Sequence, residues 1–202
     1  MSQCYYRQYN LLIVPNKCAS VTVGSVLNHA QVPTPEIAQI FANRRSVQVW
    51  ATTRNPVDYF VSGYRFLYYA QNDSHMAVQN TFADHLQFCV DQAAAFTGDY
   101  PGYFGGHAWW GPLRTVRKQW GIEKPVNWIK LEDPNAVWLH MRKLYNIRMD
   151  RSVRLNTSPK TPPIEFTDRV IDLIKQLENW SGECGYDIES RAETIARTIN
   201  TI

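Results

Sequence analysis

One junction limits the fold of this chain more than any other part of the sequence: a strand-forming run leads directly into the strongest helix start. Residues 46–52 (SVQVWAT) are rich in β-branched side chains and partly alternate, which favours a strand. Asn55 can then cap a helix, Pro56 suits the first helical position, and Asp58 suits the positive end of the helix dipole. A strand that passes at once into a helix is typical of α/β folds.

The rest of the chain alternates between strand and helix patterns in the same way. Further strands are predicted at residues 9–14 and 126–131, where short apolar runs are flanked by polar residues. Helices are predicted from apolar residues at three- and four-residue spacing and from prolines at the expected helix boundaries. They are expected at 23–30, 36–43, from Asn55 onward, at 82–95, from about Pro134, and at 165–180. This order predicts a parallel sheet with ligands at the carboxyl ends of its strands.

Composition indicates one ordinary globular domain, because 45% of the 202 residues are apolar and 19% are charged. No linker rich in Gly, Ser or Pro divides the chain, so residues 1–202 are expected to form a single domain. No apolar stretch approaches the roughly 20 residues that span a bilayer, and no signal-peptide core is visible, so a cytoplasmic location is expected. The four cysteines show no CxxC spacing, which favours free thiols over a zinc site.

The positive charge of the chain is concentrated in one segment. The net charge is only +3, but residues 111–160 carry eleven Lys and Arg against four Asp and Glu. Such a band fits either an anionic ligand or a solvated helical face, and the charge alone leaves both open. No nucleic-acid-binding motif accompanies these residues, so DNA or RNA is not the expected partner.

A lysine and several small or hydroxyl residues separate the first predicted strand from the following helix. They are Lys17, Cys18, Ala19, Ser20, Val21 and Thr22. Backbone N–H groups at a helix start, together with a lysine and hydroxyls, form a cradle for anions. The pattern GxxxxGK[ST] is absent, so this is not a Walker A loop, and a small-residue turn of no function is the alternative.

The segment RNPVDYFVSGYR places Arg54 at the end of the predicted strand and Ser62 two helical turns further on. Alternatively, Arg54 pairs with Asp58 and Ser62 merely permits close helix packing. With the cradle, the segment resembles the sulfotransferases that use 3′-phosphoadenosine 5′-phosphosulfate (PAPS), most of all their carbohydrate branch. The matching residues of the family's R-x-P-x-x-x-x-V-S-x-Y-R pattern are Arg54, Pro56, Val61, Ser62, Tyr64 and Arg65.

The resemblance implies a three-layer α/β/α fold with a central parallel sheet, similar to the P-loop nucleotide hydrolases. It also implies that Lys17 and a hydroxyl, from Ser20 or Thr22, hold the 5′-phosphosulfate. Arg54 and Ser62 are implied to hold the 3′-phosphate. Residues 155–160 (LNTSPK) are similar to an N-x-S-x-K stretch of several members, which implies nucleotide contacts for Ser158 and Lys160.

Sulfuryl transfer needs a base for the acceptor hydroxyl and a cation for the phosphate leaving group. Lys17 suits the second role. His107 is the first candidate for the base, because it lies in the Gly- and aromatic-rich segment 97–112, where a His-Trp segment of the family often falls. His75 or a carboxylate are the alternatives. The histidines inside predicted helices, at positions 29, 85 and 140, are expected to be structural.

The resulting expectation is a PAPS-dependent sulfotransferase that acts on a hydroxyl of a small molecule or glycan, without a metal ion. A non-catalytic nucleotide-binding or scaffold protein of the same fold is the alternative from another class. A P-loop-like nucleotide kinase is a third possibility, although it requires a Walker lysine motif and a magnesium carboxylate that the sequence lacks.

Overall fold

The computed structural model describes residues 3–15, 27, 36, 46–69, 81–95, 122, 125–146, 164–178 and 181–199. The chain forms two compact units. The first comprises Met1–Arg54 and Gly121–Thr157, and the second comprises Asn55–Trp120 and Ser158–Ile202. Among the described residues, the first unit contains a β-sheet and α-helical residues that include the helix Pro134–Tyr145, and the second contains α-helices.

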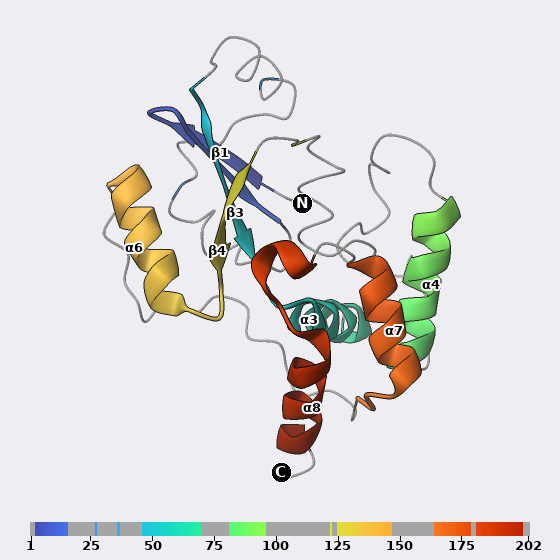
Figure 1. Ribbon diagram of the computed structural model, residues 1–202. Helices are drawn as coiled ribbons and strands as arrows, with labels where there is room; N and C mark the ends of the chain where they lie inside the picture. The colour runs from blue at the N-terminus through green and yellow to red at the C-terminus, as the bar shows by residue number, and fades with distance from the viewer. Residues whose placement is uncertain are drawn as a thin grey trace. The chain divides into compact units, whose positions relative to one another are not determined.

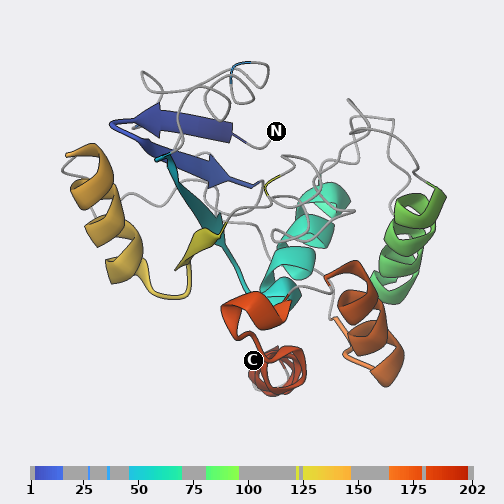
Figure 2. The same cartoon turned by 45° about the horizontal axis from the view of Figure 1, so that its top comes forward.

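The first unit is built on a mixed, four-stranded sheet (Figures 1 and 2). Its strands lie in the order β1 (Gln3–Arg7), β2 (Asn10–Val14), β3 (Gln48–Thr53) and β4 (Val126–Lys130). The last three are parallel to one another, as the alternation of strands and helices predicted. β1 runs antiparallel to β2, so the sheet is not purely parallel, and this strand was not predicted.

The turn between β1 and β2 explains why the hairpin escaped prediction. Its two residues, Gln8 and Tyr9, both have positive φ, at 47° and 68°. Two consecutive residues of positive φ are typical of a type I′ turn, which normally contains Asn and Gly. Gln and Tyr carry no such signal, so the strand pairing itself holds the turn in this conformation. The Tyr9 carbonyl also accepts a hydrogen bond of 2.9 Å from the Gln48 N–H.

Apolar side chains of the sheet pack against α6 (Pro134–Tyr145), which begins at the proline expected to start it. Their shared core consists of buried residues from both elements and from position 27: Tyr5, Leu12, Val14, Leu27, Ile129, Val137, Met141, Leu144 and Tyr145. Figure 1 shows this helix, in yellow, beside the strands. Burial of such side chains, each contributing about 1.5–3 kcal/mol, is the main force that attaches the helix to the sheet.

The helices predicted at 23–30 and 36–43 lie almost entirely outside the described residues. Leu27 and Glu36 are the described members of these segments, and both are helical.

The second unit contains α3 (Pro56–Tyr69), α4 (Phe82–Ala95), α7 (Asp168–Leu177) and α8 (Ile188–Ile199). A short 3-10 helix, η4 (Ser181–Cys184), precedes α8. α4 packs mainly against α7, and α3 contacts each of the other three helices. The predicted helix at 82–95 and the predicted start at Asn55 are confirmed. The last predicted helix is shorter than expected, and α8 was not predicted.

Aromatic contacts connect the helices of this unit. The ring of Tyr64 on α3 lies 5.4 Å from those of Phe82 and His85 on α4. The Phe82 ring in turn lies 6.2 Å from Phe166, just before α7, in an edge-to-face arrangement. Such pairs favour one geometry of packing, because ring edges and faces carry opposite partial charge.

Candidate functional site at the β3–α3 junction

The carboxyl ends of β3 and β4 lie side by side in the sheet. Thr53, the last residue of β3, is the register partner of Lys130, the last residue of β4. The Leu131 N–H donates to the Thr53 carbonyl at 3.0 Å, which continues the pairing one residue beyond the strands. Arg54 therefore follows a strand end that is held firmly in place. Ligands of open α/β sheets bind at this edge.

The Thr53 side chain is an unusual feature of this edge. It is fully buried, and its Oγ1 has no hydrogen-bond partner among the residues that the structure describes. An unsatisfied buried polar group costs about 1–3 kcal/mol, so it is rarely present without a reason. A hydroxyl in this state is suited to contact a bound polar molecule. Thr53 was not among the predicted site residues, because a threonine within a β-branched run carries no signal that would have revealed it.

Arg54 is half-buried, and among the residues that the structure describes its guanidinium has no hydrogen-bond or ion-pair partner. The carboxylate of Asp58, the alternative partner that the sequence offers for Arg54, forms an ion pair with Arg191 within the second unit. A partly buried arginine without a carboxylate partner is suited to bind an anion, since its planar group donates two parallel hydrogen bonds.

Hydrogen bonds to Asn55 already use N–H groups of the first turn of α3. Oδ1 of the buried Asn55 accepts the Val57 N–H at 3.0 Å, and the Asn55 carbonyl accepts the Tyr59 N–H at 2.9 Å. Pro56 has no N–H to offer. Backbone donors at this helix start are therefore largely occupied, so an anion bound at the start of α3 depends on side chains of the helix such as Ser62 and on the helix dipole.

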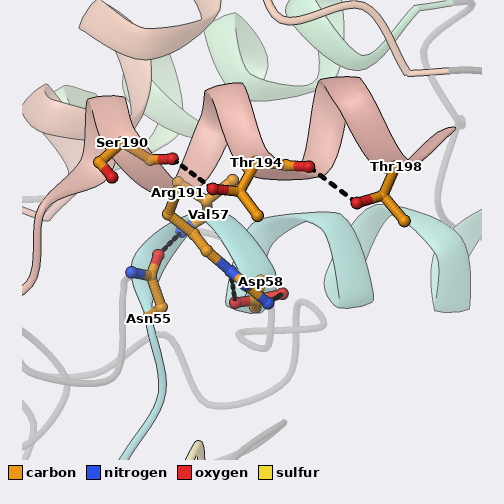
Figure 3. A network of polar contacts seen from close by, with 7 residues as sticks. All are labelled: Asn55, Val57, Asp58, Ser190, Arg191, Thr194 and Thr198. Atoms are coloured by element: carbon orange, nitrogen blue, oxygen red, sulfur yellow. Dashed lines mark hydrogen bonds and ion pairs between the residues drawn. The ribbon is translucent and has the colours of Figure 1, made fainter. Parts of the chain in front are cut away.

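Asp58 forms a two-bond ion pair with Arg191 of α8 (Figure 3). Nε of Arg191 donates to Oδ2 at 2.7 Å, and Nη2 donates to Oδ1 at 3.0 Å. The Asp58 side chain is 16% exposed and that of Arg191 39%. Because both carboxylate oxygens are used and the pair is partly shielded from water, it joins α8 to the first turn of α3 more firmly than an exposed surface pair.

Ser62 and Arg65 follow Asp58 along α3 at spacings of four and seven residues, which place all three on one face of the helix. Ser62 is half-buried, and its hydroxyl has no hydrogen-bond partner within the described part of the chain. Nε of Arg65 is buried and also lacks a partner. Among the described residues, the face that carries Asp58 thus has hydrogen-bond donors without partners one and two turns further on.

α4 carries a cysteine and a histidine side by side, a combination that in other proteins can act as nucleophile and base. The Cys89 Sγ lies 3.6 Å from the His85 Nε2, and both side chains are buried. Burial lowers the pKa of His85 to about 4 and raises the pKa of the Cys89 thiol. Both groups are therefore neutral at physiological pH, whereas a nucleophilic cysteine requires a thiolate beside a charged imidazolium. This pair belongs to the core.

His140 on α6 is also engaged in packing. Its ring lies 5.1 Å from that of Trp50, and its pKa is lowered, first by burial and then by the positive charge of Lys143. Cys4, Cys89 and Cys184 are buried free thiols, as expected. Within the residues described, no cluster of three or more His, Cys, Asp or Glu side chains could hold a metal ion.

The remaining predicted site residues lie outside the described residues. These are Lys17, Cys18, Ala19, Ser20, Val21, Thr22, His107, Ser158 and Lys160, together with the alternative base His75. Arg54 and Ser62 are the predicted site residues that the structure describes. None of the helices in the described ranges is long and apolar enough to cross a membrane.

No family model matches this chain, and no curated protein and no solved structure matches it either. Its function must therefore be inferred from its motifs and from the geometry of the described elements that carry them.

Proposed function

We propose that this protein is a PAPS-dependent sulfotransferase. It transfers a sulfuryl group in line from the 5′-phosphosulfate to an acceptor hydroxyl and releases adenosine 3′,5′-bisphosphate. The bond from sulfur to the phosphate oxygen breaks, a bond from sulfur to the acceptor oxygen forms, and the acceptor proton passes to a base. The proposal includes the full three-layer α/β/α sulfotransferase fold, in which helices cover both faces of the sheet.

One observation carries the proposal: Arg54, without a partner among the described residues, stands between the end of a parallel strand and an Asn-capped helix that carries Ser62. In the family that the chain resembles, the R-x-P-x-x-x-x-V-S pattern holds the 3′-phosphate through its Arg and Ser, which supports the same roles for Arg54 and Ser62. An arginine gives two charge-assisted hydrogen bonds to a phosphate, and the serine adds a third donor. The dipole of α3 favours the same negative charge.

The 5′ end of the nucleotide is assigned to the segment after β2. Lys17 binds and stabilises the leaving phosphate, and Ser20 or Thr22 donates a hydroxyl to the phosphosulfate. Cys18, Ala19 and Val21 contribute backbone N–H groups to the cradle. Ser158 and Lys160 close over the nucleotide.

The base is assigned to His107, with His75 or a carboxylate as alternatives. An imidazole suits the role because its pKa lies near neutral pH. The basic band of residues 111–160 favours an anionic acceptor such as a glycan, whereas an uncharged small molecule has no use for it.

Calorimetry with adenosine 3′,5′-bisphosphate, in chelator and in Mg²⁺, tests the nucleotide assignment. We expect micromolar or tighter binding that does not need the metal, and clearly weaker binding of 5′-AMP. Binding that strictly requires Mg²⁺ would instead indicate the kinase, and no binding would exclude the proposal.

Radiolabelled PAPS, offered with a set of hydroxyl acceptors, separates the enzyme from a scaffold. Transfer of label to any acceptor supports catalysis, and tight nucleotide binding without transfer across the set indicates a binding protein.

A further inference from the structure

Asp58 poses an electrostatic problem for the proposed phosphate site. It lies four residues after Arg54 and one helical turn before Ser62, the two residues assigned to the 3′-phosphate. A bare carboxylate so close to a phosphate would repel it, since like charges several ångströms apart interact strongly when partly shielded from water. Something must offset this charge if the site is to bind an anion.

Arg191 is placed to do so. Its guanidinium covers both oxygens of Asp58, at 2.7 and 3.0 Å, from a helix 133 positions further along the chain (Figure 3). The Asp58 side chain is largely buried beneath this contact. On the same helix, the hydroxyls of Thr194 and Thr198 donate to carbonyls of α8 itself, each at 2.8 Å.

We propose that Arg191 is a positioning residue of the phosphate site, which acts through Asp58: it cancels the carboxylate charge and orients it away from the anion, so that the face of α3 bearing Ser62 accepts a phosphate. The inference rests on the proposed function. It assigns to the C-terminal helix a role in nucleotide affinity that no motif indicates. The role differs from simple helix packing in one respect: loss of the Arg191 charge weakens nucleotide binding, whereas loss of the Asp58 charge does not.

Removing Arg191 exposes the Asp58 charge, whereas removing the Asp58 charge leaves a cation behind. We therefore expect Arg191→Met to weaken binding of adenosine 3′,5′-bisphosphate about 3- to 20-fold. Asp58→Asn should not weaken it. The double variant Asp58→Asn/Arg191→Met should return to within about twofold of the unmodified chain, because the two changes interact at one contact.

Two further variants of the full chain complete the experiment, each measured by calorimetry and thermal melting. Arg191→Lys keeps the charge without the two-bond geometry and should lose less affinity than Arg191→Met. Arg197→Met is the matched control, since it removes the same charge from the same helix, where Arg197 pairs with the exposed Glu193. Its affinity should not change.

The outcomes separate the possibilities. If Asp58→Asn weakens binding as much as Arg191→Met, and the double variant does not recover, the pair is a packing contact and the inference is wrong. Equal losses in Arg197→Met and Arg191→Met would show an effect of net charge only, which also overturns it. If the unmodified chain binds no nucleotide, the proposed function itself fails. Should Arg191→Met not fold, the lysine and double variants decide the matter.

Discussion

α3 and α4 begin with the same local pattern but use it differently. Each has a capping residue, Asn55 or Thr81, whose carbonyl accepts the N–H four residues on, and each has an aspartate at the third helical position. In α4 the pattern closes on itself. Thr81 Oγ1 donates to Asp84 Oδ2 at 2.7 Å and accepts the Asp84 N–H at 3.1 Å.

In α3 the corresponding acid points elsewhere. Asp58 is bonded to Arg191 of α8, and the cap is buried rather than exposed. Arg54 precedes the α3 cap, whereas the uncharged Asn80 precedes the α4 cap. The same capping pattern can therefore serve two purposes. In α4 it only begins the helix. In α3 its aspartate also connects the first turn to a second helix, α8, and Arg54 precedes the cap in the sequence. The second arrangement is the one for which a ligand is proposed.

The largest effect is expected from replacing Arg54, the cation that precedes the α3 cap and has no counterpart before the α4 cap. Arg54→Ala should weaken binding of adenosine 3′,5′-bisphosphate by about 2–4 kcal/mol, because it removes a charge-assisted partner of the 3′-phosphate. Calorimetry should also show that the preference over 5′-AMP is lost. Arg169→Ala is the control, an exposed arginine in the first turn of α7. A variant at Arg54 that keeps the full preference would remove this residue from the site.

The next effect concerns the fourth helical position, which is Tyr59 in α3 and His85 in α4. Burial lowers the pKa of His85 from 6.5 to about 4. Acid therefore protonates His85 at a lower pH in the folded chain than in the unfolded chain. Because the unfolded chain binds this proton first, the contribution of neutral His85 to the free energy of unfolding is complete above pH 6.5 and is lost as the pH falls towards 4. The loss amounts to about 3 kcal/mol.

Urea unfolding between pH 7.5 and 4 measures this dependence. His85→Phe keeps an aromatic ring beside Tyr64 and should be less sensitive to acid than the unmodified chain over this interval. Identical acid sensitivity of the two proteins would show that His85 is not the group that titrates.

A smaller difference is expected between the caps themselves. Asn55→Ala should lower the free energy of unfolding by about 2 kcal/mol, since it leaves the buried Val57 N–H without a partner. Thr81→Ala should lower it by only about 1 kcal/mol, because water replaces the lost bond at an exposed helix end. Denaturant titrations of the two variants provide the test. Equal losses would mean that burial of the α3 cap adds nothing.

The smallest expected effect is the difference in free energy of unfolding between variants of two ion pairs of α8. Arg191→Met should lower the free energy of unfolding by about 1 kcal/mol, since its pair with Asp58 has two bonds and is partly buried. Arg197→Met should change it by less than about 0.5 kcal/mol, because both members of its pair with Glu193 are exposed. Thermal melts at low and high salt separate the two, and a larger loss at Arg197 would reverse the ranking.

Local sequence was sufficient for the elements whose signals lie within a few residues. The Asn55 cap, the proline starts at positions 56 and 134, and the strand run before Arg54 all act through bonds between near neighbours, and each element was observed. β1 was missed because its turn, Gln8–Tyr9, lacks the usual residues of positive φ. α8 was missed although Asp187 caps it, accepting the Ser190 N–H at 3.0 Å, and the isoleucines at 188, 195 and 199 give it helical spacing.

By itself, therefore, the sequence determined where α3 begins, and it singled out Arg54 and Ser62 as candidates for an anion site. The tertiary structure decided what Asp58 does. A cap closes over three or four residues, so its partner can be read from the local pattern, as in α4. The partner of Asp58 lies 133 positions away. Nothing in the spacing of residues selects Arg191 from the other basic residues, because only the packing of α8 against α3 brings the two charges together.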